Sequence, residues 1–132
     1  MRNKPCLTSA DTQKIMAACL AEAEKNKWNV AISIVDDGGY LLRFERMDGT
    51  APVSAEVSLG KARTSALTRR PSKFFEDRIK ERPAFITFPA GLPIQGAVPI
   101  LQQNDCLGAV GVSGVQSHED EQIAQAGIKA LG

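Results

Sequence analysis

Two segments of alternating side chains, each wrapped around a tight turn, restrict the fold of this chain more than any other feature. The first runs through residues 28–45 and turns at Asp36-Asp37-Gly38-Gly39, and the second runs through residues 98–113 and turns near Asn104-Asp105. Alternation with a period of two indicates strands, and Asp and Gly residues between two such strands favour a hairpin. We therefore expect an antiparallel sheet.

Segments with helical periodicity lie before, between and after these hairpins. They are residues 9–26, 52–68 and 72–80, followed by a last helix that begins at Ser117. The residues expected at the helix starts are Thr8, Pro52, Ser72, and Ser117 together with Asp120. The order helix, hairpin, two helices, loop, hairpin, helix predicts one α+β domain over residues 1–132, with an antiparallel sheet covered by helices.

Charge and composition argue against several classes of function. The 16 Lys and Arg residues nearly balance the 15 Asp and Glu residues, giving a net charge of +1, so a nucleic-acid partner is not expected. No apolar run reaches the roughly 18 residues that cross a bilayer, and the chain opens without a hydrophobic signal region, so we expect a cytoplasmic protein without a membrane partner. The 3 cysteines form no Cys-x-x-Cys pair and His118 is the single histidine, so no metal site is expected.

The loop between Phe88 and Ile100 is the first candidate for a binding site. It is apolar but contains too many Pro and Gly residues for a regular element. Backbone N–H groups around Gly91 and Gly96-Ala97 could form a nest for a carboxylate. The same segment could instead be a structural crossover or part of a subunit contact.

Charged side chains near the first hairpin and in the second helix are further candidates. Arg46 could hold a carboxylate beside Glu45, although solvated surface charges would give the same pattern. Lys61 lies on the same side of its helix as Val53, Val57 and Thr64. A half-buried ammonium there could bind an anion or act as a base, or its stem could simply extend past apolar neighbours into solvent.

Several short motifs together resemble the GlcG/HbpS family. They cover nearly the whole chain in the family's order, which is more specific than any one motif. The motifs are Val35-Asp36-Asp37-Gly38-Gly39, Glu45-Arg46-Met47-Asp48-Gly49, Lys61-Ala62-Arg63-Thr64, Phe88-Pro89, Gly96-Ala97-Val98-Pro99-Ile100 and Gly108-Ala109-Val110-Gly111-Val112-Ser113-Gly114 followed by Glu119-Asp120-Glu121.

This resemblance implies a profilin-like sheet with helices that assembles as a homo-oligomer, often an octamer. Family members include haem-binding proteins, proteins encoded beside glycolate oxidation and a lyase acting on hydroxylaminobenzoate, so the family shares no single reaction. The positions matching its recurrent pattern, where the resemblance places the pocket, are Glu45, Arg46, Asp48, Lys61, Phe88, Gly96, Ala97, Val98 and Pro99.

Two functional hypotheses follow from the residues and the resemblance. In the first, a pocket near a subunit interface binds a planar, carboxylate-bearing ligand such as haem, with Arg46 or Lys61 neutralising the carboxylate and the apolar loop covering the ring. In the second, the protein is a cofactor-free lyase or related enzyme acting on a small aromatic acid, amine or hydroxylamine. Glu45 or Lys61 would then move protons while Arg46 fixes the carboxylate.

Overall fold

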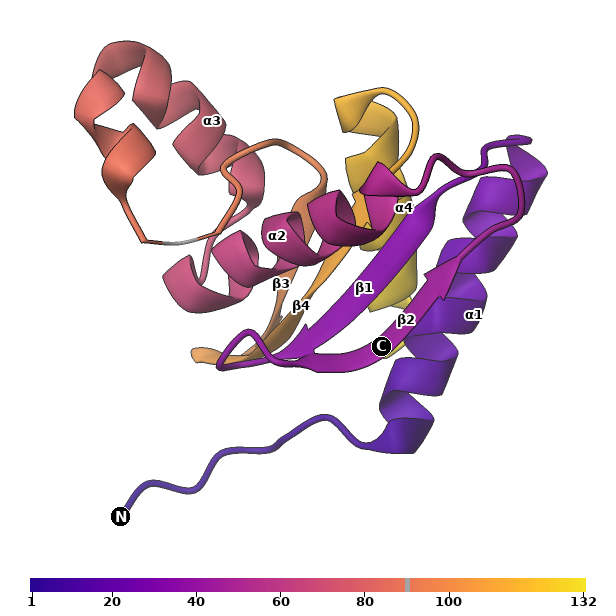
Figure 1. The fold of residues 1–132 in the computed structure, drawn as a ribbon. Helices are drawn as coiled ribbons and strands as arrows, with labels where there is room; N and C mark the ends of the chain where they lie inside the picture. The colour runs from indigo at the N-terminus through magenta and orange to yellow at the C-terminus, as the bar shows by residue number, and fades with distance from the viewer. Residues whose placement is uncertain (90) are drawn as a thin grey trace.

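The computed structural model describes residues 1–89 and 91–132, which form one open antiparallel sheet with helices on both faces. The strands lie in the order β2-β1-β4-β3 (Figure 1). The elements are α1 (Ser9–Lys25), β1 (Ala31–Asp36), β2 (Leu41–Arg46), α2 (Val53–Thr68), α3 (Ser72–Glu81), the 3-10 helix η1 (Pro83–Thr87), β3 (Ala97–Gln102), β4 (Asp105–Ser113) and α4 (Ser117–Lys129). The predicted α+β class is confirmed.

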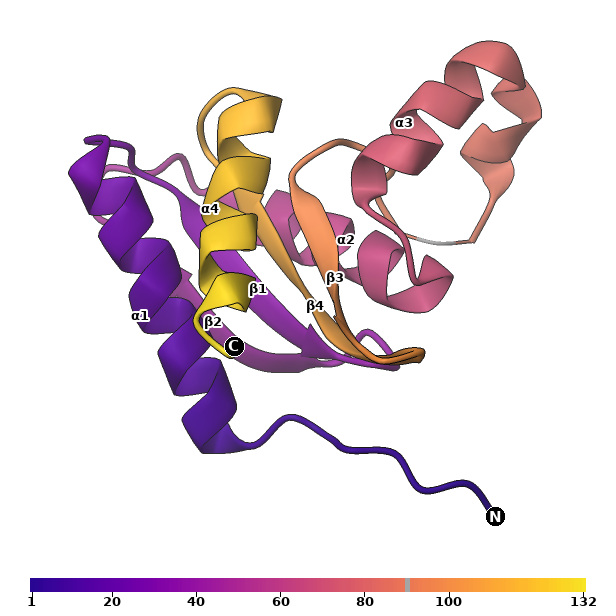
Figure 2. The same ribbon diagram turned by 180° about the vertical axis from the view of Figure 1, so that it is seen from behind.

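The two faces of the sheet are packed differently. Figure 1 shows α2 lying across one face, and Figure 2, seen from behind, shows α1 and α4 side by side on the other. The main apolar core lies on the α1–α4 face, where Ile32, Ile34 and Val110 meet Ile15 and Ile123. Burial of such side chains is the main favourable term in folding.

Helix α2 packs against the sheet through small residues. Its buried positions include Ser58 and Ala62, and a Cβ added at Gly111 of β4 would lie 2.3 Å from the Ser58 carbonyl oxygen. Val53, expected on the buried side, is instead 64% exposed. Lys61 and Thr64 are buried, on the side that the pattern predicted. The pattern missed the small buried residues, because close approach to a sheet selects small side chains, which carry little hydrophobic signal.

The helix caps were predicted with mixed success. Thr8 caps α1 through a reciprocal pair of bonds with Asp11, as expected. Ser72 does not cap α3, because its hydroxyl accepts the Ala97 N–H of β3 at 3.0 Å. At α4 the N-cap is Gln116, paired with Glu119. Two of the side chains expected to cap these helices, Ser72 and Asp120, instead contact β3 and α2.

Strand β2 forms one edge of the sheet and leaves apolar side chains at the surface. A register shift between Ile34 and Val35 brings Leu41 onto the same face as Phe44, beside α2. Leu41 is 50% exposed and Phe44 is 39% exposed. An exposed, apolar edge strand is unusual in a protein that remains a single chain.

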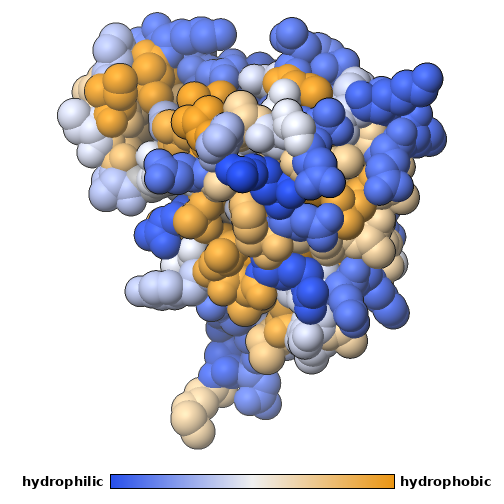
Figure 3. Space-filling model, turned by 45° about the vertical axis from the view of Figure 1, so that its right-hand side comes forward, coloured by the Kyte–Doolittle hydropathy of each residue, from blue (hydrophilic) through white to orange (hydrophobic). Residues whose placement is uncertain are grey.

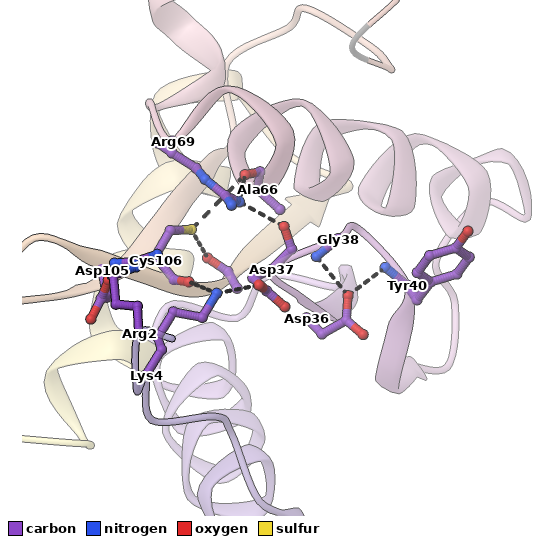
Figure 4. A network of polar contacts seen from close by, with 11 residues as sticks. Arg2, Lys4, Asp36, Asp37, Gly38, Tyr40, Ala66, Arg69, Asp105 and Cys106 are labelled. Carbon is purple, nitrogen blue, oxygen red and sulfur yellow. Dashed lines mark hydrogen bonds and ion pairs between the residues drawn. The ribbon is translucent and has the colours of Figure 1, made fainter.

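Both hairpin turns lie at one end of the sheet, where a polar network joins them to the N-terminal segment and to α2 (Figure 4). Lys4 pairs with Asp37, and this bond lowers the pKa of the Asp37 carboxyl. Arg69, at the left-handed C-terminus of α2, donates to the Asp37 carbonyl oxygen at 2.6 Å.

Within residues 1–89 and 91–132, no helix is long and apolar enough to span a bilayer.

Candidate functional site

The residues expected to form the pocket fall in three separate parts of the molecule. Glu45, Arg46 and Asp48 lie together at the end of β2, on the α1 side. The Lys61 side chain of α2 lies against Gly96, and Ala97, Val98 and Pro99 follow Gly96 in β3. Phe88 lies in a projecting arm formed by α3 and η1.

The first place is an open, polar depression of about 300 Å³. Arg46 and Asn29 line it together with carboxylates from α1, from β2 and from the turn after β2, and Leu20 and Met47 contribute its apolar part. The carboxylates are Glu24, Glu45 and Asp48. A guanidinium beside carboxylates suits a ligand that carries both charges, because each charge can meet its opposite.

The second place is a buried ion pair between Lys61 of α2 and Asp120 of α4. The Lys61 ammonium donates to Asp120 Oδ2 at 3.1 Å and to the Val112 carbonyl oxygen at 3.0 Å. The two side chains are only 3% and 2% exposed. The other Asp120 oxygen accepts the Val115 N–H at 3.1 Å, so the pair joins α2, β4 and α4.

Burial determines the chemistry of this pair. Desolvation raises the pKa of Asp120 above its ordinary value, and the Lys61 charge offsets only part of that rise. Gly96 lies against the ammonium, since a Cβ there would be 2.7 Å from Lys61 Nζ. Lys61 therefore has a partner and lies away from solvent. The structure does not bring it together with Glu45, which lines the separate polar depression.

The third place is a cluster of phenylalanines in the arm. Phe88 stacks on Phe75 with ring centroids 5.4 Å apart and planes 14° apart, and Phe85 lies 6.0 Å from Phe88. Phe88 is 47% exposed, so one face of the cluster is open to solvent. Thr64 of α2 and Gly91 line a small space beneath the rings.

Arginines surround these rings. The Arg82 guanidinium lies 5.3 Å from the Phe85 ring centroid, and the Arg70 guanidinium lies 4.3 Å from that of Phe74. Arg82, Phe85 and Phe88, with Ala84 and Thr87, line a depression of about 180 Å³. Sequence reasoning missed Arg82 and Phe85 as site residues. The available signal was the repetition of Arg and Phe through residues 70–88.

The arm can therefore hold a flat, anionic molecule. An aromatic ring can stack on Phe85 or Phe88, while the Arg82 guanidinium can hold a carboxylate in a bidentate pair. The side chains lining this depression include no imidazole, thiolate or thioether. Across the described part of the chain, no group of three or more His, Cys, Asp or Glu residues is arranged to hold a metal ion.

Sequence comparisons identify related proteins over most of the chain. A family model described as "Haem degrading protein HbpS-like" matches residues 7–129. Protein GlcG of Escherichia coli strain K12 is 44% identical over 114 residues, which cover 86% of this chain and 85% of GlcG. An uncharacterized 15.0 kDa protein from the dhaT-dhaS intergenic region of Citrobacter freundii is 30% identical over 129 residues, covering 92% of this chain and 89% of that protein.

Solved structures share the fold. A crystal structure of HbpS superposes with a TM-score of 0.92 at 30% identity, covering 100% of this chain and 94% of HbpS. A double mutant of Streptomyces reticuli HbpS gives the same TM-score at 29% identity, covering 100% and 91%. A PduOC:heme complex gives 0.88 at 23% identity, covering 96% and 95%, which shows a common fold.

Proposed function

Because the chain belongs to the HbpS-like family, as its motifs indicated, we propose that it binds a planar, carboxylate-bearing small molecule, with haem as the first candidate. The observation that carries this proposal is the depression lined by Arg82, Phe85 and Phe88, where a guanidinium adjoins the half-buried ring of Phe85 and the exposed ring of Phe88. The crystallised PduOC relative is described in complex with heme, which supports haem as the first ligand to test.

Haem meets the properties of this depression in two respects. Its porphyrin face can stack on Phe88, and a propionate can pair with Arg82. When bound, haem would supply its iron for ligand or redox chemistry. The lining residues supply contacts to the ring and carboxylate, and a flat aromatic acid without iron would satisfy the same contacts.

The remaining pocket residues take different parts in this proposal. Ala97 fixes the base of the arm, because its N–H donates to the Ser72 hydroxyl at 3.0 Å. Gly96 leaves room for Lys61, while Val98 and Pro99 continue β3 away from the arm. We place the ligand site near a subunit interface of a homo-oligomer, for which the family resemblance implies eight subunits.

Haem titration of purified variants tests the proposal. We expect Phe88→Ala and Arg82→Ala each to weaken haem binding at least tenfold, equivalent to about 1.4 kcal/mol. Arg46→Ala is the matched control, since this arginine lies in the other depression, and it should bind haem as the wild type does. The measurement is the Soret absorbance change. The proposal fails if the wild type gives no change or if Arg46→Ala alone loses binding.

A second candidate function is a cofactor-free lyase acting on a small aromatic acid that carries an amine or hydroxylamine. The observation favouring it is the polar depression, where Arg46 can hold a carboxylate while Glu45 and Asp48 face the nitrogen group. Lys61 lies outside this depression, so a proton partner for Glu45 would be Glu24 or Asp48.

Turnover by this second candidate separates it from ligand binding. A screen of small aromatic acids that carry a hydroxylamine or an amine should identify a substrate. Glu45→Gln should lose the conversion of this substrate, and Phe88→Ala should keep it. The isosteric Glu24→Gln variant shows whether Glu24 is the proton partner. Full conversion by Glu45→Gln would exclude Glu45 as the residue that moves protons.

A further inference from the structure

Two exposed apolar surfaces of this chain differ in shape. We define the arm surface as Arg82, Phe85, Ile86 and Phe88, and the groove as Leu41 and Phe44 of β2 with Ala55, Glu56 and Leu59 of α2. The arm projects from the body beyond β3 (Figure 1), and Ile86 is 72% exposed on it. The groove is a hollow of about 230 Å³.

Both surfaces expose large apolar side chains to water. Figure 3 shows hydrophobic side chains on the arm at the upper left and again across the middle of the same view. In the groove, Leu41 and Phe44 lie on an edge strand whose backbone has a free side. Natural proteins protect such edges with charge, bulges or a covering element.

Charge distinguishes the two surfaces. Arg82 belongs to the arm and Glu56 to the groove, and neither forms an ion pair with another of the described residues. An arm against the arm of a second copy would bring arginines together, and a groove against a groove would bring carboxylates together. An arm against a groove places opposite charges face to face.

We propose that the arm of one copy seats in the β2–α2 groove of a second copy. Ile86 enters the hollow beside Leu41 and Phe44. Arg82 approaches Glu56 of the second copy with the guanidinium N–H groups that a ligand carboxylate leaves free. Because two different surfaces meet, the contact is head to tail, and each copy keeps one arm and one groove with which to bind its two neighbours. The second copy covers the open side of the Phe88 depression, a step that rests on the proposed ligand site and makes that site incomplete in one chain.

Mixing two defective variants tests this contact. Ile86→Asp disables the arm, Leu41→Asp disables the groove, and both positions are exposed, so circular dichroism should show the wild-type fold. Native mass spectrometry should find each variant alone in a smaller assembly than the wild type. In an equal mixture, the intact arm of Leu41→Asp can bind the intact groove of Ile86→Asp. The mixture should therefore form species of twice that mass with equal numbers of the two chains, and a nitrogen-15 label on one variant distinguishes the two in the mass spectrum.

Several results would overturn the contact. They are a monomeric wild type, a single variant that assembles fully, or a mixture that gains no mass. If an Asp variant unfolds, Ile86→Ser and Leu41→Ser replace the pair.

Haem titration separates this inference from the ligand proposal. A wild-type assembly that fails to bind haem refutes only the ligand, whereas Ile86→Asp binding haem as tightly as the wild type shows that the second copy is no part of the site.

Discussion

At the scale of single residues, the Lys61–Asp120 pair is the most unusual feature of the protein. Removing two charges from water is costly, and breaking such a pair leaves the remaining charge without compensation, typically at about 3 to 5 kcal/mol. We expect Lys61→Met to lower the free energy of unfolding by that amount at pH 7, because Asp120 then stays buried without the ammonium. Urea denaturation measures it.

The pH dependence of that loss identifies its cause. The pKa of Asp120 is raised in the native state, so between its ordinary value and the native value the folded protein binds more protons, and stability falls as the pH rises. Lys61→Met raises this pKa further. Its destabilisation should therefore be smaller at pH 4 than at pH 7, and an equal loss at both would contradict the explanation. Lys73→Met, in the exposed pair with Asp77, is the control and should change stability by less than about 1 kcal/mol.

At the scale of elements, the sequence predicted those structures whose signal is local. Helix α1 begins after Thr8 and the first hairpin turns at Asp36, as capping and turn chemistry indicated. The small residues on the buried face of α2 and the caps of α3 and α4 were missed. Ser72 and Asp120 have ordinary capping chemistry, but the Ser72 hydroxyl binds Ala97 and one Asp120 oxygen binds Lys61. Partners so distant in sequence leave no trace in the local pattern.

Packing of α2 on β4 depends on the missing side chain of Gly111. A Cβ there would lie 2.3 Å from the Ser58 carbonyl oxygen and 2.6 Å from the Ala62 nitrogen. Gly111→Ala should therefore displace α2 and lower the free energy of unfolding by at least about 1 to 3 kcal/mol, as overpacking does. Gly38→Ala is the control, since its Cβ would find no atom nearer than 3.5 Å. Comparable thermal midpoints for the two variants would show that α2 adapts without cost.

At the scale of the whole molecule, the site was the least predictable feature. The motifs identified the family, but they suggested one pocket, whereas the expected pocket residues lie in three separate places of a single chain. Periodicity assigns a residue to a face of its element and says little about which distant faces meet. Arg82 escaped notice because its role depends on the turn from α3 into η1, which brings its guanidinium over Phe85.

The proposed contact between the arm of one copy and the groove of a second concerns the assembly of the whole molecule, and exchange of charges across it tests the contact directly. Arg82→Glu should place a carboxylate against Glu56 of the second copy, and Glu56→Arg should place a guanidinium against Arg82. Each single variant should therefore raise the dissociation constant of the assembly at least tenfold, equivalent to about 1.4 kcal/mol. The double variant restores opposite charges with their positions exchanged, and its dissociation constant should return toward that of the wild type. Sedimentation velocity without ligand at low salt measures the dissociation constants of the two single variants and the double variant.

Lys129→Glu is the control, because it makes an equal charge change at an exposed position of α4 on the opposite face of the sheet, and it should leave assembly unchanged. If the double variant is weaker than both singles, Arg82 and Glu56 do not face each other.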